Sequence, residues 1–266
     1  MQSTNLKQLM AEGRIWFGKQ SATSPRPRRR LRSEQLATFG ISAIDNALPE
    51  GGLSFGAVHE WSFECEVTSK QKKLWYAPTT VVTSVLRQTL NENEFHEKQL
   101  IAWVGERIWP TPHILKLTSP ADSWSWEKHA IFLRPRSKEK NLWSIIQLLR
   151  SPATLAVIAD GSGLNLIATR RIQLAAQKHN ALCFLIRPPW ELASPSTALT
   201  KWRIEPEKSD AEERWKLWLL SAKGLPAPLH WQLEWREDDN GKTNSLSLAQ
   251  AEEGRESIEK QRRRGT

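Results

Sequence analysis

The chain has 266 residues, is 39% hydrophobic and 25% charged, and carries a formal net charge of +9. A chain of this length builds one substantial α/β core more readily than two small domains. Its apolar runs are far shorter than the roughly 18 to 20 residues of a membrane-spanning helix, and its amino terminus has no apolar signal core. We therefore expect a cytoplasmic protein without a membrane partner.

The positive charge is concentrated at the amino terminus, where residues 1–37 carry +6 of the net +9. Residues 3–20 are compatible with a short helix, and residues 21–33 with a flexible arm. We place a partly disordered basic segment at 1–35. Its arginines could contact DNA phosphates, an interaction that salt weakens, although a solvated linker explains the composition equally well. These arginines are Arg26, Arg28, Arg29, Arg30 and Arg32.

Residues 36–61 resemble the approach to a nucleotide site. A short helical segment ends at a break at 49–52, and the apolar run 56–63 predicts a buried strand. A phosphate loop would follow that strand, but residues 63–73 read FECEVTSKQKK and contain no glycine. A phosphate cradle needs backbone N–H groups in a turn that tolerates positive φ. Ser69 and Lys70 are therefore present without the loop that would orient them.

Strand and helix patterns alternate over residues 56–187, which predicts a mostly parallel sheet with crossover helices. After the first strand we expect a helix at 78–90, strands at 100–105 and 130–133, a helix capped by Asn141 and a strand at 154–160. The five residues GSGLN then lead into a helix, and a buried strand follows at 181–188. The apolar face of that helix is expected at Leu164, Ile167, Ala168, Ile172, Ala175 and Ala176.

The last third of the chain has a different pattern. Three segments between residues 200 and 237 alternate apolar and polar residues, as antiparallel strands with one wet face do. The core therefore spans 36–237. Residues 238–266 are charged and poor in large apolar groups, so we expect a disordered tail with at most a marginal helix.

The chain contains fourteen tryptophans, one tyrosine and two cysteines. Tryptophans in strand-like segments are expected in the core. Cys65 and Cys183 lie in apolar runs, where a reduced buried thiol is expected. Four other tryptophans lie in Pro/Ser-rich loops and would suit a protein interface. They are Trp109, Trp124, Trp126 and Trp190.

The order of these elements resembles the core of the RecA recombinases, over about residues 36–237. The motif WVGE ends in Glu106, at the position that assists ATP hydrolysis in that family, and TLAVIAD ends in Asp160, at the position of the Mg²⁺-binding carboxylate. The Walker A loop is missing, and short segments replace both DNA-binding loops. The resemblance therefore implies vestigial ATPase positions, no catalysis, no cofactor and no filament on single-stranded DNA.

The run from residue 148 to 206 is similar to the central block of the ImuA family, accessory proteins of inducible mutagenesis. This resemblance implies a non-enzymatic adaptor in DNA-damage-induced translesion synthesis. Its implied partners are an ImuB-type inactive homologue of the Y-family polymerases, an error-prone replicative-type polymerase and RecA.

Two other hypotheses stay open. A SulA-like cell-division inhibitor that binds FtsZ would also use a nucleotide-free RecA-like fold, but the length and basic arm count against it. The second is an ATPase with an atypical phosphate loop. No histidine has a partner at metal-ligand spacing, so we expect no metal. The turn DGSG around Ser162 could bind an anion at the start of the next helix.

Overall fold

The structure is a computed structural model that describes residues 36–64, 75–92, 99–117, 125–207, 213–225, 228–237 and 244–250. The predicted amino-terminal helix, the five arginines of the arm, Cys65, Ser69, Lys70 and Trp124 lie outside these ranges. The chain divides into the units Met1–Arg32 and Ser33–Thr266, and the fold below belongs to the second unit.

The elements follow one another in the order expected for an α/β core. They are β1 (Leu36–Ala37), α2 (Ser42–Asp45), β2 (Leu53–Ser54), β3 (Val58–Phe63), α3 (Thr79–Glu92), β4 (Leu100–Val104), η1 (Glu106–Ile108), α4 (Pro112–Leu117), α5 (Trp126–His129), β5 (Ala130–Leu133), α6 (Lys138–Leu149), β6 (Thr154–Asp160), α7 (Leu166–His179), β7 (Leu182–Ile186), η2 (Pro189–Glu191), β8 (Thr200–Glu207), β9 (Arg214–Ala222), β10 (Leu229–Glu237) and β11 (Asn244–Gln250).

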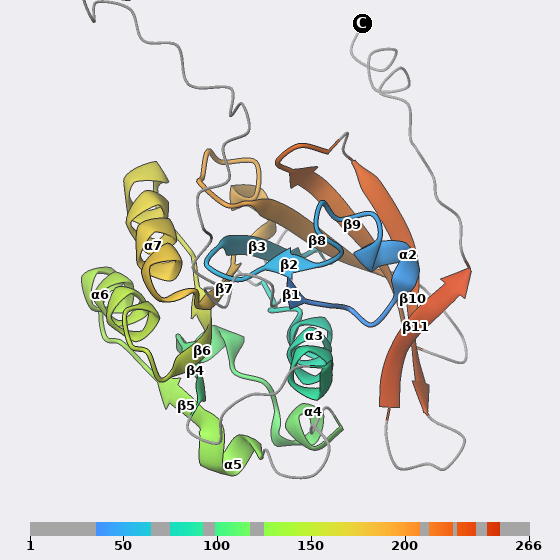
Figure 1. Cartoon of the computed structure of the whole chain (residues 1–266), viewed down its shortest axis with the longest axis horizontal. Helices are drawn as coiled ribbons and strands as arrows, with labels where there is room; N and C mark the ends of the chain where they lie inside the picture. Colours follow the sequence, from blue (N-terminus) through green and yellow to red (C-terminus); the bar gives the residue numbers. More distant parts are fainter. Residues whose placement is uncertain are drawn as a thin grey trace, which may run out of the picture. The chain divides into compact units, whose positions relative to one another are not determined.

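The main sheet has the strand order β11-β10-β9-β8-β3-β7-β6-β4-β5 (Figure 1). The pairs from β5 to β8 are parallel, and the pairs β8–β9, β9–β10 and β10–β11 are antiparallel. The predicted parallel core with antiparallel carboxy-terminal strands is confirmed.

Helices cover both faces of the parallel part of the sheet and create three layers (Figure 1). On one face, α6 and α7 enclose a core that includes Val157, Ile172 and Leu185. On the other face, α3 and the segment 36–55 enclose a second, more aromatic core. Strand β6 contributes to both cores, which explains its continuous apolar sequence.

Helix α3 forms at the predicted place although its sequence is rich in β-branched residues. Val81, Val85 and Leu86 lie on its buried side. Its hydroxyl groups do not compete with the helix, because Thr83 and Thr89 donate to the carbonyl groups one turn earlier, at 2.7 and 2.6 Å. Helical spacing of the apolar residues therefore outweighs β-propensity here.

The aromatic core confirms that tryptophans of the strands pack inside. Trp61 of β3 stacks on Trp202 of β8 with ring centroids 5.3 Å apart and an interplanar angle of 14°. Phe39, Phe184 and Trp231 surround this pair. The parallel pairing of β3 with β8 places Trp61 opposite Trp202, so the stacking follows from strand register.

The predicted cap of α6 is wrong. The helix begins at Lys138, and the hydroxyl of Ser137 accepts a hydrogen bond from the Lys140 N–H at 3.2 Å. Asn141 lies one turn inside the helix, and its amide donates to the carbonyl of Asp160 at 2.8 Å. Ser137 has the extended backbone that a cap needs, whereas Asn141 links α6 to the end of β6.

Part of the segment after Glu237 differs from its prediction as a tail with at most a marginal helix, and residues 238–243 and 251–266 of it lie outside the described ranges. Residues 244–250 form β11, which pairs with β10 across six register positions. Leu246 and Leu248 pack against the aromatic core. Two leucines on one face of a strand are a weak sequence signal, and the open edge of β10 provides the pairing that makes them a strand.

His59 is buried at the centre of the sheet. Its Nδ1 lies 2.8 Å from the Thr200 hydroxyl, and its Nε2 lies 3.1 Å from the Ser54 carbonyl. Burial lowers the pKa of His59 to about 4, and the hydrogen bond to Ser54 opposes that shift. The same exclusion of water raises the pKa of the Cys183 thiol, and the side chain is buried, as expected.

We predict that His59 makes the fold acid-sensitive. The pKa of His59 is lower in the folded chain than in the unfolded chain. Its contribution to the free energy of unfolding is therefore complete above pH 6.5 and is lost as the pH falls towards about 4. A lowering of this size corresponds to roughly 3 kcal/mol. Urea unfolding of wild type and His59→Gln between pH 4 and 7 measures it. The wild type should lose more stability on acidification than the variant, and parallel curves would contradict the assignment.

Candidate functional site

The carboxyl ends of the parallel strands bring the two predicted vestigial positions together. Glu106 follows β4, Asp160 ends β6, and both line one cavity of about 830 Å³. Gly105 makes this approach possible, since it has φ +114° and a Cβ there would lie 2.6 Å from the Cβ of Asp160. The juxtaposition that the resemblance implies is therefore present in the structure.

Each of these two carboxylates already has a partner within the protein. Glu106 pairs with Arg134 at 2.8 Å on the exposed rim. Asp160 accepts a hydrogen bond from the Ser162 N–H at 2.9 Å and another from the Ser162 hydroxyl. Other cations, among them Arg136 and Lys138, line the same cavity. Both carboxylates are held by the side chains and turns around them.

The start of α3 is where a phosphate loop would deliver its backbone donors. Pro78 precedes the helix and has no N–H to offer. The N–H of Thr79 donates to the Ala77 carbonyl at 2.8 Å. Neither position 78 nor position 79 therefore offers a free backbone N–H to a phosphate. Thr79 and Thr80 occupy the beginning of the helix that follows β3, in agreement with the predicted helix start at 78.

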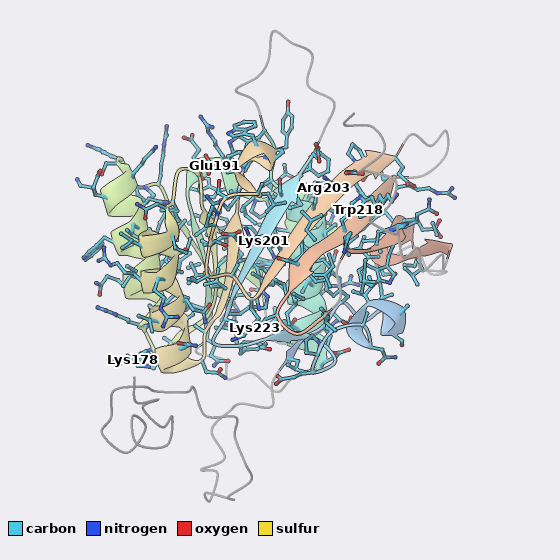
Figure 2. All side chains as sticks on the ribbon, turned by 90° about the horizontal axis from the view of Figure 1, so that it is seen from above. Lys178, Glu191, Lys201, Arg203, Trp218 and Lys223 are labelled. Carbon is cyan, nitrogen blue, oxygen red and sulfur yellow. The ribbon has the colours of Figure 1, made fainter. Side chains whose placement is uncertain are left out.

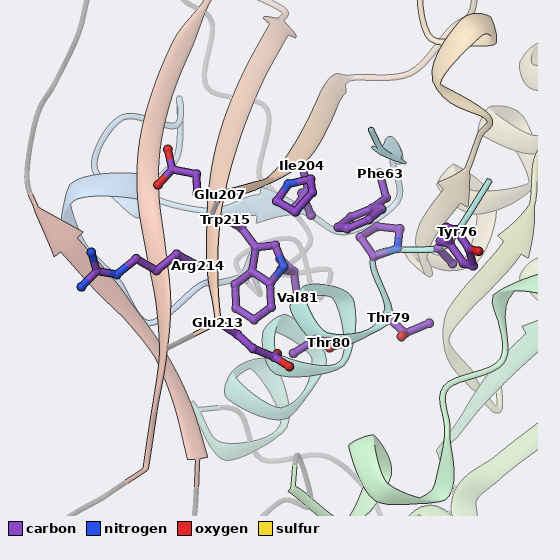
Figure 3. A pocket seen from close by; sticks show the side chains of 13 residues that line it. Phe63, Tyr76, Thr79, Thr80, Val81, Ile204, Glu207, Glu213, Arg214 and Trp215 are labelled. Atoms are coloured by element: carbon purple, nitrogen blue, oxygen red, sulfur yellow. The ribbon is translucent and has the colours of Figure 1, made fainter. Parts of the chain in front are cut away.

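A second cavity, of about 580 Å³, opens between the end of β3, the start of α3 and the ends of β8 and β9 (Figure 3). Figure 3 shows Phe63, Tyr76 and Trp215 among its lining side chains, together with the carboxylates of Glu207 and Glu213. Arg214 also lines the cavity, so the two carboxylates exceed its positive charge by one, which disfavours a triphosphate with its several negative charges.

The two segments at the places of the recombinase DNA loops are short and held to the core. Five residues separate β6 from α7, as predicted. In that turn the Gly163 N–H donates to the Glu191 carboxylate at 2.8 Å, so the protein itself supplies the anion considered for the DGSG turn. The second segment, 187–199, follows β7 and contains η2. Figure 2 labels Glu191 of this segment. It also labels Lys201 of β8, whose ammonium group contacts the segment.

A buried ion pair holds the second segment against the sheet. Arg187, directly after β7, contacts Glu60 in the middle of β3 at 2.9 Å, and both side chains are almost fully buried. Arg187 also donates to the Leu164 carbonyl at 2.9 Å and lies 3.3 Å from Glu191. The pair thus connects β3, β7, the turn before α7 and η2.

Lys201 completes this group of charges. Its ammonium lies 3.5 Å from the second oxygen of Glu60, at ion-pair rather than hydrogen-bond distance. It donates to the carbonyl groups of Leu192 and Ser194 at 2.9 and 2.7 Å. The sequence analysis did not predict this cluster. Two signals in the sequence could have indicated it, namely a glutamate inside one apolar strand, Glu60, and an arginine directly after a second apolar strand, Arg187.

The four predicted partner-contacting tryptophans differ in their positions. Trp190 on η2 is 54% exposed and Trp109 after η1 is 36% exposed, so both are accessible. Trp109 lies edge-on to Phe132 of β5, with ring centroids 5.6 Å apart. Trp126 is only 4% exposed and belongs to the aromatic core, which corrects its assignment as a contact residue. Trp124 lies outside the described ranges.

The described part of the chain is compatible with neither a metal site nor a membrane-spanning helix. No group of three or more His, Cys, Asp or Glu side chains has the arrangement of a metal site there. No helix in the same ranges is long and apolar enough to cross a membrane.

Comparison with known proteins supports the resemblances drawn from the sequence. No family model matches the chain. The chain is 27% identical over 226 residues to Protein ImuA from two strains of Caulobacter vibrioides, with 77% of this chain and 86% of each relative covered. The crystal structure of the RadB recombinase superposes with a TM-score of 0.52 at 14% identity, covering 75% of this chain and 96% of that one. Similarity to ImuA and a RecA-like α/β fold are thereby confirmed.

We predict that the pair Glu60–Arg187 is a stability element rather than a surface contact. Arg187→Met leaves a carboxylate in the core without its main partner, which costs about 3 kcal/mol. The matched control is Arg134→Met, which breaks the exposed pair with Glu106 and should cost less than about 1 kcal/mol. Urea unfolding at neutral pH compares the two variants, and equal losses would contradict the structural role of the buried pair.

Proposed function

We propose that this chain is a non-enzymatic RecA-like adaptor in DNA-damage-induced translesion synthesis and mutagenesis. In this proposal it acts in the cytoplasm and binds an ImuB-type inactive polymerase homologue, which links it to an error-prone replicative-type polymerase, with RecA as a further partner. The similarity to Protein ImuA over 77% of the chain supports the role, and the RecA-like fold supports the domain type.

The observation that carries the non-enzymatic part of the proposal is the start of α3. Pro78 has no N–H, and the N–H of Thr79 is bonded within the chain at 2.8 Å. Residues 63–78 contain no glycine. Phosphoryl transfer depends on a backbone cradle, a lysine and a metal that act together on the phosphates. The two donors missing from α3 leave an incomplete cradle.

Two exposed aromatic side chains support a role in protein binding rather than in catalysis. The exposed rings of Trp109 and Trp190 lie after η1 and on η2, on separate connections at the carboxyl ends of strands. Exposed tryptophans are frequent energetic centres of protein interfaces. Direct DNA contact through the five arginines of residues 26–32 stays part of the proposal.

One observation favours a second hypothesis, an ATPase with an atypical phosphate loop. Glu106 and Asp160 line the same cavity, as a water-activating and a metal-binding carboxylate would. Measurement of nucleotide binding separates this hypothesis from the adaptor.

We predict that the purified full chain binds no Mg²⁺-ATP at millimolar concentration in isothermal titration calorimetry. Co-expression with an ImuB-type homologue should yield a complex that survives size-exclusion chromatography. Asp160→Ala, which removes the carboxylate of the vestigial site, should leave that complex unchanged. ATP binding that disappears in Asp160→Ala would establish a working nucleotide site. Absence of the complex would overturn the adaptor role.

A further inference from the structure

We propose that the outer face of α7 is a docking surface for an acidic, apolar segment of a protein partner. The proposal rests on the adaptor function above and assigns the ImuB-type homologue to this face. We define the α7 face by its exposed members Ile167, Arg170, Arg171, Leu174 and Lys178.

The spacing of these residues makes one continuous stripe. Arg170 and Arg171 are adjacent, and each lies three or four residues from both Ile167 and Leu174, with Lys178 four residues further on. Such spacing aligns side chains on one side of a helix. The opposite side of α7, with Ile172 and Ala176, is fully buried against the sheet. Helix α7 therefore has an apolar inner face, as expected for Ile172 and Ala176. Ile167, which the sequence placed on that face, is instead directed outwards together with Leu174.

The exposure of these aliphatic groups is high. Ile167 is 72% exposed and Leu174 is 50% exposed, and Leu166 in the first turn is 49% exposed. On the neighbouring helix α6, Trp143 is 64% exposed. These four residues are half of the eight large hydrophobic residues that the described part of the chain exposes. Several exposed apolar side chains on neighbouring helices mark an interaction site more often than single exposed apolar side chains do.

Charge defines what such a partner must be. Helix α7 contains no acidic residue. Within the described ranges neither Arg170 nor Arg171 forms an ion pair, and Lys178 extends the positive charge to the last turn (Figure 2). An aliphatic stripe flanked by cations is complementary to a segment that has leucine-like groups on one side and carboxylates beside them.

The aliphatic groups favour a protein over a nucleic acid. Single-stranded DNA is bound by cations along its backbone and by flat aromatic rings on which the bases stack. Ile167 and Leu174 cannot stack with a base, but they gain from burial against another apolar side chain. Arg170 and Arg171 lie one turn from each of them, where they would meet carboxylates at the rim of a protein contact.

The test captures the ImuB-type homologue with tagged full-length chain. Ile167→Ser/Leu174→Ser should weaken binding tenfold or more in titration calorimetry, since loss of central apolar contacts has effects of that order. Arg170→Glu/Arg171→Glu should weaken it similarly, and salt should weaken the wild-type complex. The controls are Tyr76→Ser, which removes an exposed ring elsewhere, and Lys223→Glu at the turn after β9, and both should bind like wild type. Urea unfolding establishes that every variant is folded.

Each outcome has one meaning. Wild-type failure to capture the homologue overturns the adaptor function and this surface with it. Capture by wild type and by both double variants alike overturns the surface alone. A labelled single-stranded oligonucleotide tests the nucleic-acid alternative by fluorescence anisotropy. If Arg170→Glu/Arg171→Glu weakens only oligonucleotide binding, and Ile167→Ser/Leu174→Ser leaves capture unchanged, the α7 face is a nucleic-acid surface and the proposal is wrong.

Discussion

The ion pair between Glu60 and Arg187 is the constraint on which the carboxyl edge of the sheet depends. Two charges taken out of water are costly unless each has a close partner, so neither residue can change alone. Arg187 is the first residue after β7, and its second nitrogen reaches the Leu164 carbonyl and the Glu191 carboxylate. One buried guanidinium therefore fixes both segments that stand where the recombinases carry DNA-binding loops. Both connections are thereby tied to the strands of the core.

The same edge explains how a RecA-like scaffold persists without a conventional phosphate loop. The sheet order and the close approach of Gly105 to Asp160 follow from packing of the strands and need no bound nucleotide. The aromatic core around Trp61 and Trp202 stabilises β3 and β8 at the point where the nucleotide site would begin. Packing alone therefore maintains an architecture that does not depend on a bound nucleotide.

Sequence reasoning predicted the parts of the fold that local patterns determine. The helix at 79–92 and the strand at 154–160 follow from apolar spacing, and their places agree with the structure. The cap of α6 was missed because Ser137 and Asn141 are both good caps, and only the backbone around Ser137 selects between them. Strand β11 was missed because the segment is short and mostly polar, and only its pairing with the neighbouring β10 makes it a strand. Burial of Trp126 depends in the same way on neighbours that its Ser-rich surroundings do not reveal.

The candidate site shows the same limit. The sequence placed Glu106 and Asp160 at strand ends, and parallel topology alone brings them to one cavity. It could not show that Arg134 and Ser162 engage them, because those contacts depend on turn geometry. The α7 face escaped notice for a related reason. Ile167 fits the apolar spacing of the helix, but the position of the sheet decides which side of that helix is covered.

Hydrogen–deuterium exchange of the full chain, alone, with Mg²⁺-ATP and with the ImuB-type homologue, tests the central claim most directly. The account predicts that the homologue slows exchange in α6 and α7, whereas ATP leaves exchange at the start of α3 and at the end of β6 unchanged. Protection of residues 75–82 and of the turn after Asp160 by ATP would contradict it. That result would show that the carboxyl edge of this RecA-like domain is still a nucleotide site.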